Sequence, residues 1–139
     1  MIGQSLKLTT IRGIEVGIHY SWFIIFFLLT FSLTARFASE HAHWTMAEHY
    51  AVGIATSLLF FASILLHELA HSFVALAKGI PVRAITLFVF GGVAQIGREP
   101  DRPITEFQIA IAGPIASALL ALGFGSVAYL AGDQFEHLS

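Results

Sequence analysis

The sequence contains no cysteine and few charged residues. Without cysteine, a disulfide scaffold and a cysteine-ligated metal are both excluded. Charged residues make up 12% of the 139 residues, whereas 56% are hydrophobic. Soluble domains carry about 25% charged residues, and a small soluble globule has too much surface to cover with half that share. The composition therefore indicates a membrane protein with the lipid bilayer as its surroundings.

Basic residues are also scarce. Seven Lys and Arg residues stand against nine Asp and Glu, for a net charge of −2. So few cations leave no basic stripe for a phosphate backbone, and we expect no nucleic-acid partner. The length fits a single membrane-embedded domain, residues 1–139, or the front part of a longer protein.

Three long apolar runs are almost free of charge and cover residues 16–35, 50–78 and 105–132. Each is long enough to cross a bilayer, which takes about 20 helical residues. The first run is longer than the apolar part of a secretory signal and lacks a suitable cleavage site, so we expect it to be retained. The predicted fold is an α-helical multi-pass membrane protein with three transmembrane helices.

Two of these helices have recognisable starts, and one has a clear end. Thr45 with Glu48, and Thr105 with Gln108, form capping-box patterns that predict helix starts. Gly79, followed closely by a proline, predicts a stop after residue 78. A helix over residues 46–78 would be about 50 Å long, so it must tilt, bend or extend past a ~30 Å hydrocarbon core.

The segment 82–96 is rich in β-branched and aromatic residues and contains Gly91-Gly92. This pattern predicts a β-hairpin with a two-glycine turn, buried or at the membrane edge. The stretch over residues 6–20 has a similar composition. It either joins the same sheet or forms a loose leader.

Lys and Arg are distributed unevenly about the three spans. The N-terminal segment and residues 78–106 share one side of the membrane and carry six of the seven, whereas the other side has only Arg36. The positive-inside rule therefore places the N-terminus in the cytoplasm of a cell-membrane protein.

The second run contains the sequence LLHELAHSF. His67 and His71 are four residues apart, so on a helix they lie on one face and can share one metal ion. Glu68 points about 100° away from His67 and can reach a water molecule at that metal. This HExxH pattern predicts zinc on His67 and His71, with Glu68 as the catalytic general base. The alternative is a structural cluster of two neutral histidines and a protonated glutamate, bonded to neighbouring helices.

The predicted site lies inside the membrane. His67 and His71 precede the cytosolic helix end by about 16 and 10 Å, at 1.5 Å per residue. Hydrolysis at this depth needs water, so the surrounding helices must enclose a wet cavity.

The HELAH segment, then GIPVRAITLFVFGGVAQI, then AIAGPIASALLA, resembles the site-2 protease family of intramembrane zinc metalloproteases. The similarity is strongest to its prokaryotic branch, whose members often carry CBS domains. It implies zinc ligands His67 and His71, the catalytic base Glu68, and transmembrane segments of other proteins as substrates. It also implies that the segment around Gly91 to Val93 lies in a membrane-edge sheet near the substrate. Gly113-Pro114 matches a signature of the family's third span, whereas Ser117 stands where some branches have Asn.

A catalytic zinc normally takes three protein ligands. In the family the third is an Asp in a later Asp-Gly motif on a fourth span, and the sequence has no Asp-Gly pair. Asp133 and Glu136 follow the third span at its outer end, and Asp101 and Glu106 lie in a hydrated turn, so none is expected to substitute. His19 lies near the right depth and stays open as a ligand or as a hydrogen-bonded interfacial residue. We therefore expect the chain to be incomplete at its C-terminus and to bind zinc weakly alone.

The sequence contains other histidines, and other functions compete with this hypothesis. His41, His43 and His49 surround Trp44 in the outer loop without the spacing of a metal site, which favours a solvated interfacial loop. A histidine-box iron oxidase would need more histidines within the spans. The competing function is a catalytically inactive membrane regulator or structural protein that retains the HExxH helix.

Overall fold

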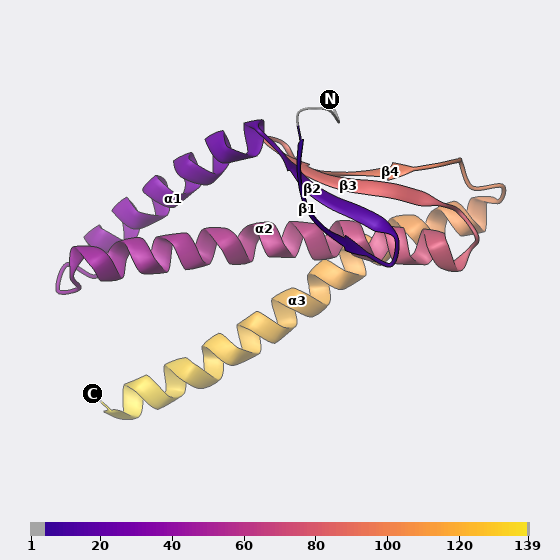
Figure 1. Cartoon of the computed structure of the whole chain (residues 1–139). Helices are drawn as coiled ribbons and strands as arrows, with labels where there is room; N and C mark the ends of the chain where they lie inside the picture. The colour runs from indigo at the N-terminus through magenta and orange to yellow at the C-terminus, as the bar shows by residue number, and fades with distance from the viewer. Residues whose placement is uncertain (1–4, 139) are drawn as a thin grey trace.

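The computed structural model describes residues 5–138, with side chains described up to residue 132 (Figure 1). These residues form seven elements, in the order β1 (Ser5–Ile11), β2 (Ile14–His19), α1 (Ser21–Glu40), α2 (Met46–Ala77), β3 (Val82–Phe88), β4 (Gly91–Ile96) and α3 (Pro103–Leu138). α1 and α2 form an antiparallel pair, and the sheet lies along the C-terminal half of α2 (Figure 1). α3 packs on α2 near its own start and then diverges from it (Figure 1).

All three helices are long and apolar enough to cross a membrane. Many of their large apolar side chains are exposed, among them Ile24, Phe27, Phe31, Leu58, Leu119 and Leu122. A helix that exposes such side chains is stable only where lipid or another apolar surface covers them. The predicted fold class, three membrane-spanning helices with a small sheet, is confirmed.

The four strands form one sheet in the order β1-β2-β3-β4. β2 pairs parallel with β3, and the other two pairs are antiparallel. One face packs on α2 through a buried apolar cluster that includes Ile14, Ile85 and Leu69. The N-terminal segment therefore joins the sheet, one of the two predicted outcomes.

The first span begins at Ser21 and not at residue 16 as predicted. Residues 16–19 belong to β2, where Val16 and Ile18 are buried. A short apolar run fits a buried strand and a membrane helix equally well, so hydropathy alone misplaces the boundary.

The predicted two-glycine turn is also wrong. Phe88 pairs with Gly91, so the turn consists of Val89 and Phe90. Both glycines start β4, where Gly91 has a φ of +123°. Gly92 has a different role, because a Cβ there would lie 3.0 Å from Glu68 Cγ on α2.

The predicted helix ends are confirmed for α2 and wrong for the start of α3. Thr45 caps α2 by accepting a hydrogen bond from the backbone of Glu48 at 3.2 Å, and Gly79 with a φ of +77° follows the helix end. α3 begins at Pro103, two residues before Thr105. Proline suits the first turn because its missing N–H would have no helical partner there.

Polar side chains fasten α1 to α2 within the apolar region. The Thr30 hydroxyl donates to Ser57 Oγ at 3.0 Å, and the Ser57 hydroxyl donates to the Gly53 carbonyl at 2.9 Å. A Cβ at Gly53 would collide with Thr34 Oγ1, so glycine is required for this close approach. Thr34 Oγ1 itself is buried without a hydrogen-bond partner among the described residues.

Candidate metal centre

His67 and His71 lie one turn apart on α2, and both are half-buried. Their Nε2 atoms face each other at 3.1 Å. Two nitrogens bound to one tetrahedral zinc at ~2.0–2.1 Å each are separated by about 3.3 Å. The observed separation therefore suits a shared metal ion, although it also suits a hydrogen bond between neutral rings.

The other nitrogen of each ring is held by α3. His71 Nδ1 lies against the carbonyl oxygen of Ile109, and His67 Nδ1 lies 2.8 Å from Ser117 Oγ. A carbonyl only accepts, so His71 Nδ1 carries the proton and its Nε2 has a free lone pair. Such partners at the second nitrogen fix the orientation and tautomer of metal-binding histidines.

Gly113 allows α3 to come this close to α2. A Cβ at this position would lie 2.6 Å from His67 Nε2 and would also collide with His71 Nε2. Any side chain here would occupy the space beside both nitrogens. The absent side chain, the two facing nitrogens and the two occupied Nδ1 atoms together fit a zinc ion.

Glu68 is half-buried on the face of α2 that meets the sheet. Its carboxylate takes part in none of the side-chain hydrogen bonds or ion pairs formed between described residues. Gly92 at the start of β4 contacts this side chain, so the edge strand passes directly beside the predicted base. The structural alternative required partners for a protonated Glu68, and the described residues provide none.

A hollow of about 360 Å³ opens next to His67. It is lined by Phe60, Ser63, Ile64, His67 and Ser117. It offers space for water or a peptide segment beside the histidine pair.

The third ligand is not present in the part of the chain whose side chains are described. Residues 5–132 contain no group of three or more His, Cys, Asp or Glu that could hold a metal. His19 is instead bonded to Ser21, and Asp101 pairs with Arg98 at 3.2 Å. Glu106 lies in the first turn of α3 and forms no metal-binding group with His67 and His71. The side chains of Asp133 and Glu136 lie outside the described residues.

The outer-loop histidines form an aromatic cluster. His41 stacks on Trp44 with ring centroids 4.0 Å apart, and His49 Nε2 lies 2.7 Å from the His41 carbonyl oxygen. His43 contacts the same rings edge-on. The cluster fastens the α1–α2 turn and, within the described residues, forms no metal site.

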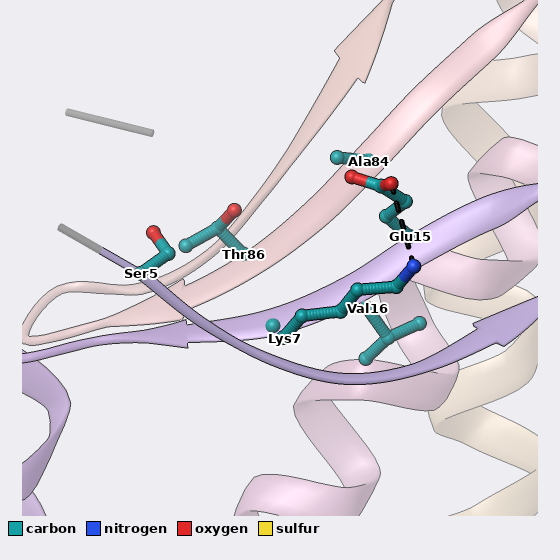
Figure 2. A pocket seen from close by; sticks show the side chains of 7 residues that line it. Ser5, Lys7, Glu15, Val16, Ala84 and Thr86 are labelled. Atoms are coloured by element: carbon teal, nitrogen blue, oxygen red, sulfur yellow. Dashed lines mark ion pairs between the residues drawn. The ribbon is translucent and has the colours of Figure 1, made fainter. Parts of the chain in front are cut away.

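A second hollow, of about 100 Å³, lies on the face of the sheet opposite α2 (Figure 2). Lys7 and Glu15 form an ion pair over it at 3.5 Å, drawn as the dashed line in Figure 2. Both side chains are more than half exposed, and such surface pairs contribute little to stability. This hollow is separate from the histidine pair.

Two contributors to the site were missed in the sequence. The Ile109 carbonyl is a backbone atom, which a residue pattern does not reveal. The sequence pattern places Gly92 in a turn and the family resemblance places it in a sheet near the substrate, but neither predicts its contact with Glu68, which depends on packing between distant segments. In the sequence Ser117 is a departure from a family pattern, and in the structure it has a partner in His67.

Comparisons with known proteins agree with this geometry. Residues 55–137 match peptidase family M50. The chain is 40% identical over 122 residues to a Synechocystis protein named "Putative zinc metalloprotease sll0528", covering 88% of this chain and 32% of that protein. It is 36% identical over 125 residues to a Mycobacterium tuberculosis protein named "Putative zinc metalloprotease Rip3", covering 90% and 32%. The chain thus spans about a third of the length of these relatives.

The fold is also similar to a solved structure, the site-2 protease from Methanocaldococcus jannaschii. The TM-score is 0.65 at 29% sequence identity, over 91% of this chain and 52% of that chain. The three helices and the sheet therefore correspond to part of a membrane-protease fold.

Proposed function

The chain belongs to peptidase family M50, and from that premise we propose that it is the front part of an intramembrane zinc endopeptidase. Its substrates are transmembrane segments of other proteins, because the histidine pair lies within a membrane-spanning helix. The observation that carries this proposal is the pair of facing Nε2 atoms, each ring fixed by α3. Glu68 follows His67 on the same helix, with its side chain against Gly92 of β4.

His67 and His71 would hold the zinc ion, and a third ligand would come from a later segment of a longer protein. Family resemblance points to an Asp in an Asp-Gly motif. A bound zinc supplies Lewis acidity to water and to the scissile carbonyl. Glu68 accepts the proton of the attacking water and delivers it to the leaving amine. Ile109 and Ser117 keep both imidazoles aligned throughout.

A transmembrane helix hides its carbonyls in hydrogen bonds, so it must unwind before cleavage. β4 is an edge strand of the described sheet, and its first residues pass beside Glu68. We propose that the unwound substrate pairs with this edge as an added strand. The N-terminus and the sheet lie on the cytoplasmic side of the cell membrane, as the distribution of Lys and Arg indicates.

The proposal is tested on the purified full-length gene product with a transmembrane-segment reporter. We expect one zinc per chain, lost in His67→Ala. Glu68→Gln should retain the zinc and lose cleavage by about a thousandfold or more, because the amide is not a base. Full cleavage by Glu68→Gln overturns the assignment. Stoichiometric zinc with no cleavage by the unaltered protein supports the inactive-regulator alternative instead.

Docking on β4 is tested with prolines. Successive N–H groups of a strand point to opposite sides, so only one of Val93→Pro and Ala94→Pro removes a donor from the free edge. That variant should retain zinc and lose cleavage of the transmembrane reporter. Unchanged cleavage by both variants contradicts strand addition.

A further inference from the structure

The start of α1 is bonded to the turn of the β3–β4 hairpin. The backbone N–H of Val89, in the turn, donates to Ser21 Oγ at 3.1 Å. Ser21 is the first residue of α1, so this bond joins the membrane span to the hairpin tip.

His19 fixes the direction of the Ser21 hydroxyl. The Ser21 backbone N–H donates to His19 Nδ1 at 3.1 Å, so that nitrogen is an acceptor. The Ser21 hydroxyl, 2.8 Å from the same nitrogen, therefore donates to it and leaves its oxygen free to accept from Val89. A continuous chain of donors runs from Val89 through Ser21 to His19.

The other side of the hairpin contacts the predicted base. Gly92 pairs with Leu87 and lies against Glu68 and Ile64 of α2. The point fastened by Ser21 is thus three residues from the point beside Glu68. Under the hairpin, Ile18, Trp22, Phe61 and Leu87 form a buried apolar cluster. Apolar contact is non-directional. The Ser21 bond therefore adds a directional contact at the turn itself, beyond the strand pairing that ends at Phe88 and Gly91.

We propose that Ser21 is a positioning residue that holds the hairpin in register over α2, with His19 orienting its hydroxyl. The inference rests on the proposed function in one respect: the register sets where a substrate strand on β4 meets Glu68. It also assigns His19 a role other than zinc ligand.

Hydrogen exchange of the full-length protein in detergent tests the bond without relying on catalysis. Ser21→Ala should raise the exchange rate of the Val89 amide about tenfold or more, because the amide loses its acceptor. Ser21→Thr keeps the hydroxyl and should stay within about twofold. Ser39→Ala is the matched control, since among the described residues the Ser39 hydroxyl bonds only to Arg36 of its own helix. Unchanged exchange at Val89 in Ser21→Ala overturns the proposal.

His19 provides an independent pair of variants. Asn can place its side-chain oxygen near the position of Nδ1, so His19→Asn should preserve slow exchange at Val89, whereas His19→Leu should not. Both should keep the zinc content of the unaltered protein. Equal exchange in the two variants, or loss of zinc in both, contradicts the proposed role of His19.

Kinetics then connect the bond to the site. In Ser21→Ala, kcat per bound zinc should fall about tenfold or more with KM nearly unchanged, because the docked strand is misplaced relative to Glu68. Ser21→Thr should restore it. A fall in kcat that disappears on normalising to zinc shows only lost folded protein and overturns the positioning role. If the unaltered protein cleaves nothing, the proposed function fails, and the exchange results still decide the Ser21 bond.

Discussion

The α1–α2 and α2–α3 contacts use the same kinds of residues with different results. In each, a glycine allows close approach and a serine hydroxyl lies between the helices: Gly53 with Ser57, and Gly113 with Ser117. At α1–α2 the hydroxyl chain ends on the Gly53 carbonyl, so its donors are satisfied. At α2–α3 Ser117 and the Ile109 carbonyl hold the Nδ1 atoms of two imidazoles, and the Nε2 atoms of these rings have only each other among the described residues.

This difference separates a structural contact from a site. Polar groups that satisfy one another inside an apolar region add specificity to helix packing. A polar side chain that is hydrogen-bonded through one atom, and whose second polar atom has no such partner, can bind a ligand with that second atom. A polar residue in a membrane helix is therefore best interpreted from the end point of its hydrogen-bond chain.

The largest expected effect comes from placing a methyl group at each glycine. Gly113→Ala should reduce bound zinc to less than about a tenth, because the methyl group collides with both imidazoles. Gly53→Ala should instead cost about 1–3 kcal/mol of stability through its clash with Thr34, with zinc per folded protein unchanged. Zinc analysis and unfolding in detergent measure the two effects. Adding Thr34→Ala to Gly53→Ala should recover part of the lost stability. If Gly113→Ala still binds a full complement of zinc, the proposed difference between the α1–α2 and α2–α3 contacts is wrong.

A smaller effect is expected from removing each serine hydroxyl. Ser117→Ala should weaken zinc binding about 10–100-fold, because His67 loses the partner that orients it. Ser57→Ala should lower stability by roughly 0.6 kcal/mol and leave zinc affinity unchanged. Competition with a chelator measures the affinity. Equal zinc affinities in the two variants would show that Ser117, like Ser57, contributes to helix packing and not to zinc binding.

The smallest effect concerns the one buried hydroxyl of the α1–α2 contact that has no partner within the described residues. Thr34→Val should leave stability unchanged or raise it by up to about 1 kcal/mol, since no hydrogen bond is lost. Thr30→Val removes the bond to Ser57 and should lower stability by roughly 0.6 kcal/mol. Unfolding of both variants in one detergent gives the comparison, and the reverse order would mean that Thr34 has a partner in the membrane.

Local signals in the sequence predicted much of the fold. Thr45 and Gly79 marked the ends of α2 because capping and left-handed backbone depend on neighbouring residues only. The boundary near residue 16 was misplaced because a buried strand within the sheet and a membrane helix are equally apolar. The hairpin turn was misplaced because glycine is needed at position 92 for close packing against Glu68 of α2 and not for the turn.

The histidine pair was predictable because four-residue spacing determines which side chains share a helix face. The contacts of the two histidines with α3 were not predictable, since they depend on where α2 and α3 cross. In the sequence, Ser117 differs from a family pattern, and nothing in that pattern predicts its bond to His67. The structure converts that departure into a specific bond to His67.

The parallel pairing of β2 with β3 has a consequence for biogenesis. The two strands are separated in the chain by the whole of α1 and α2, so their pairing is a long-range contact with a high closure cost. During synthesis the sheet can close only after both helices have been made and their ends have returned to the same side of the bilayer. The hairpin then reaches Glu68 as a late step, so the histidine pair on α2 is synthesised before β4 lies beside it.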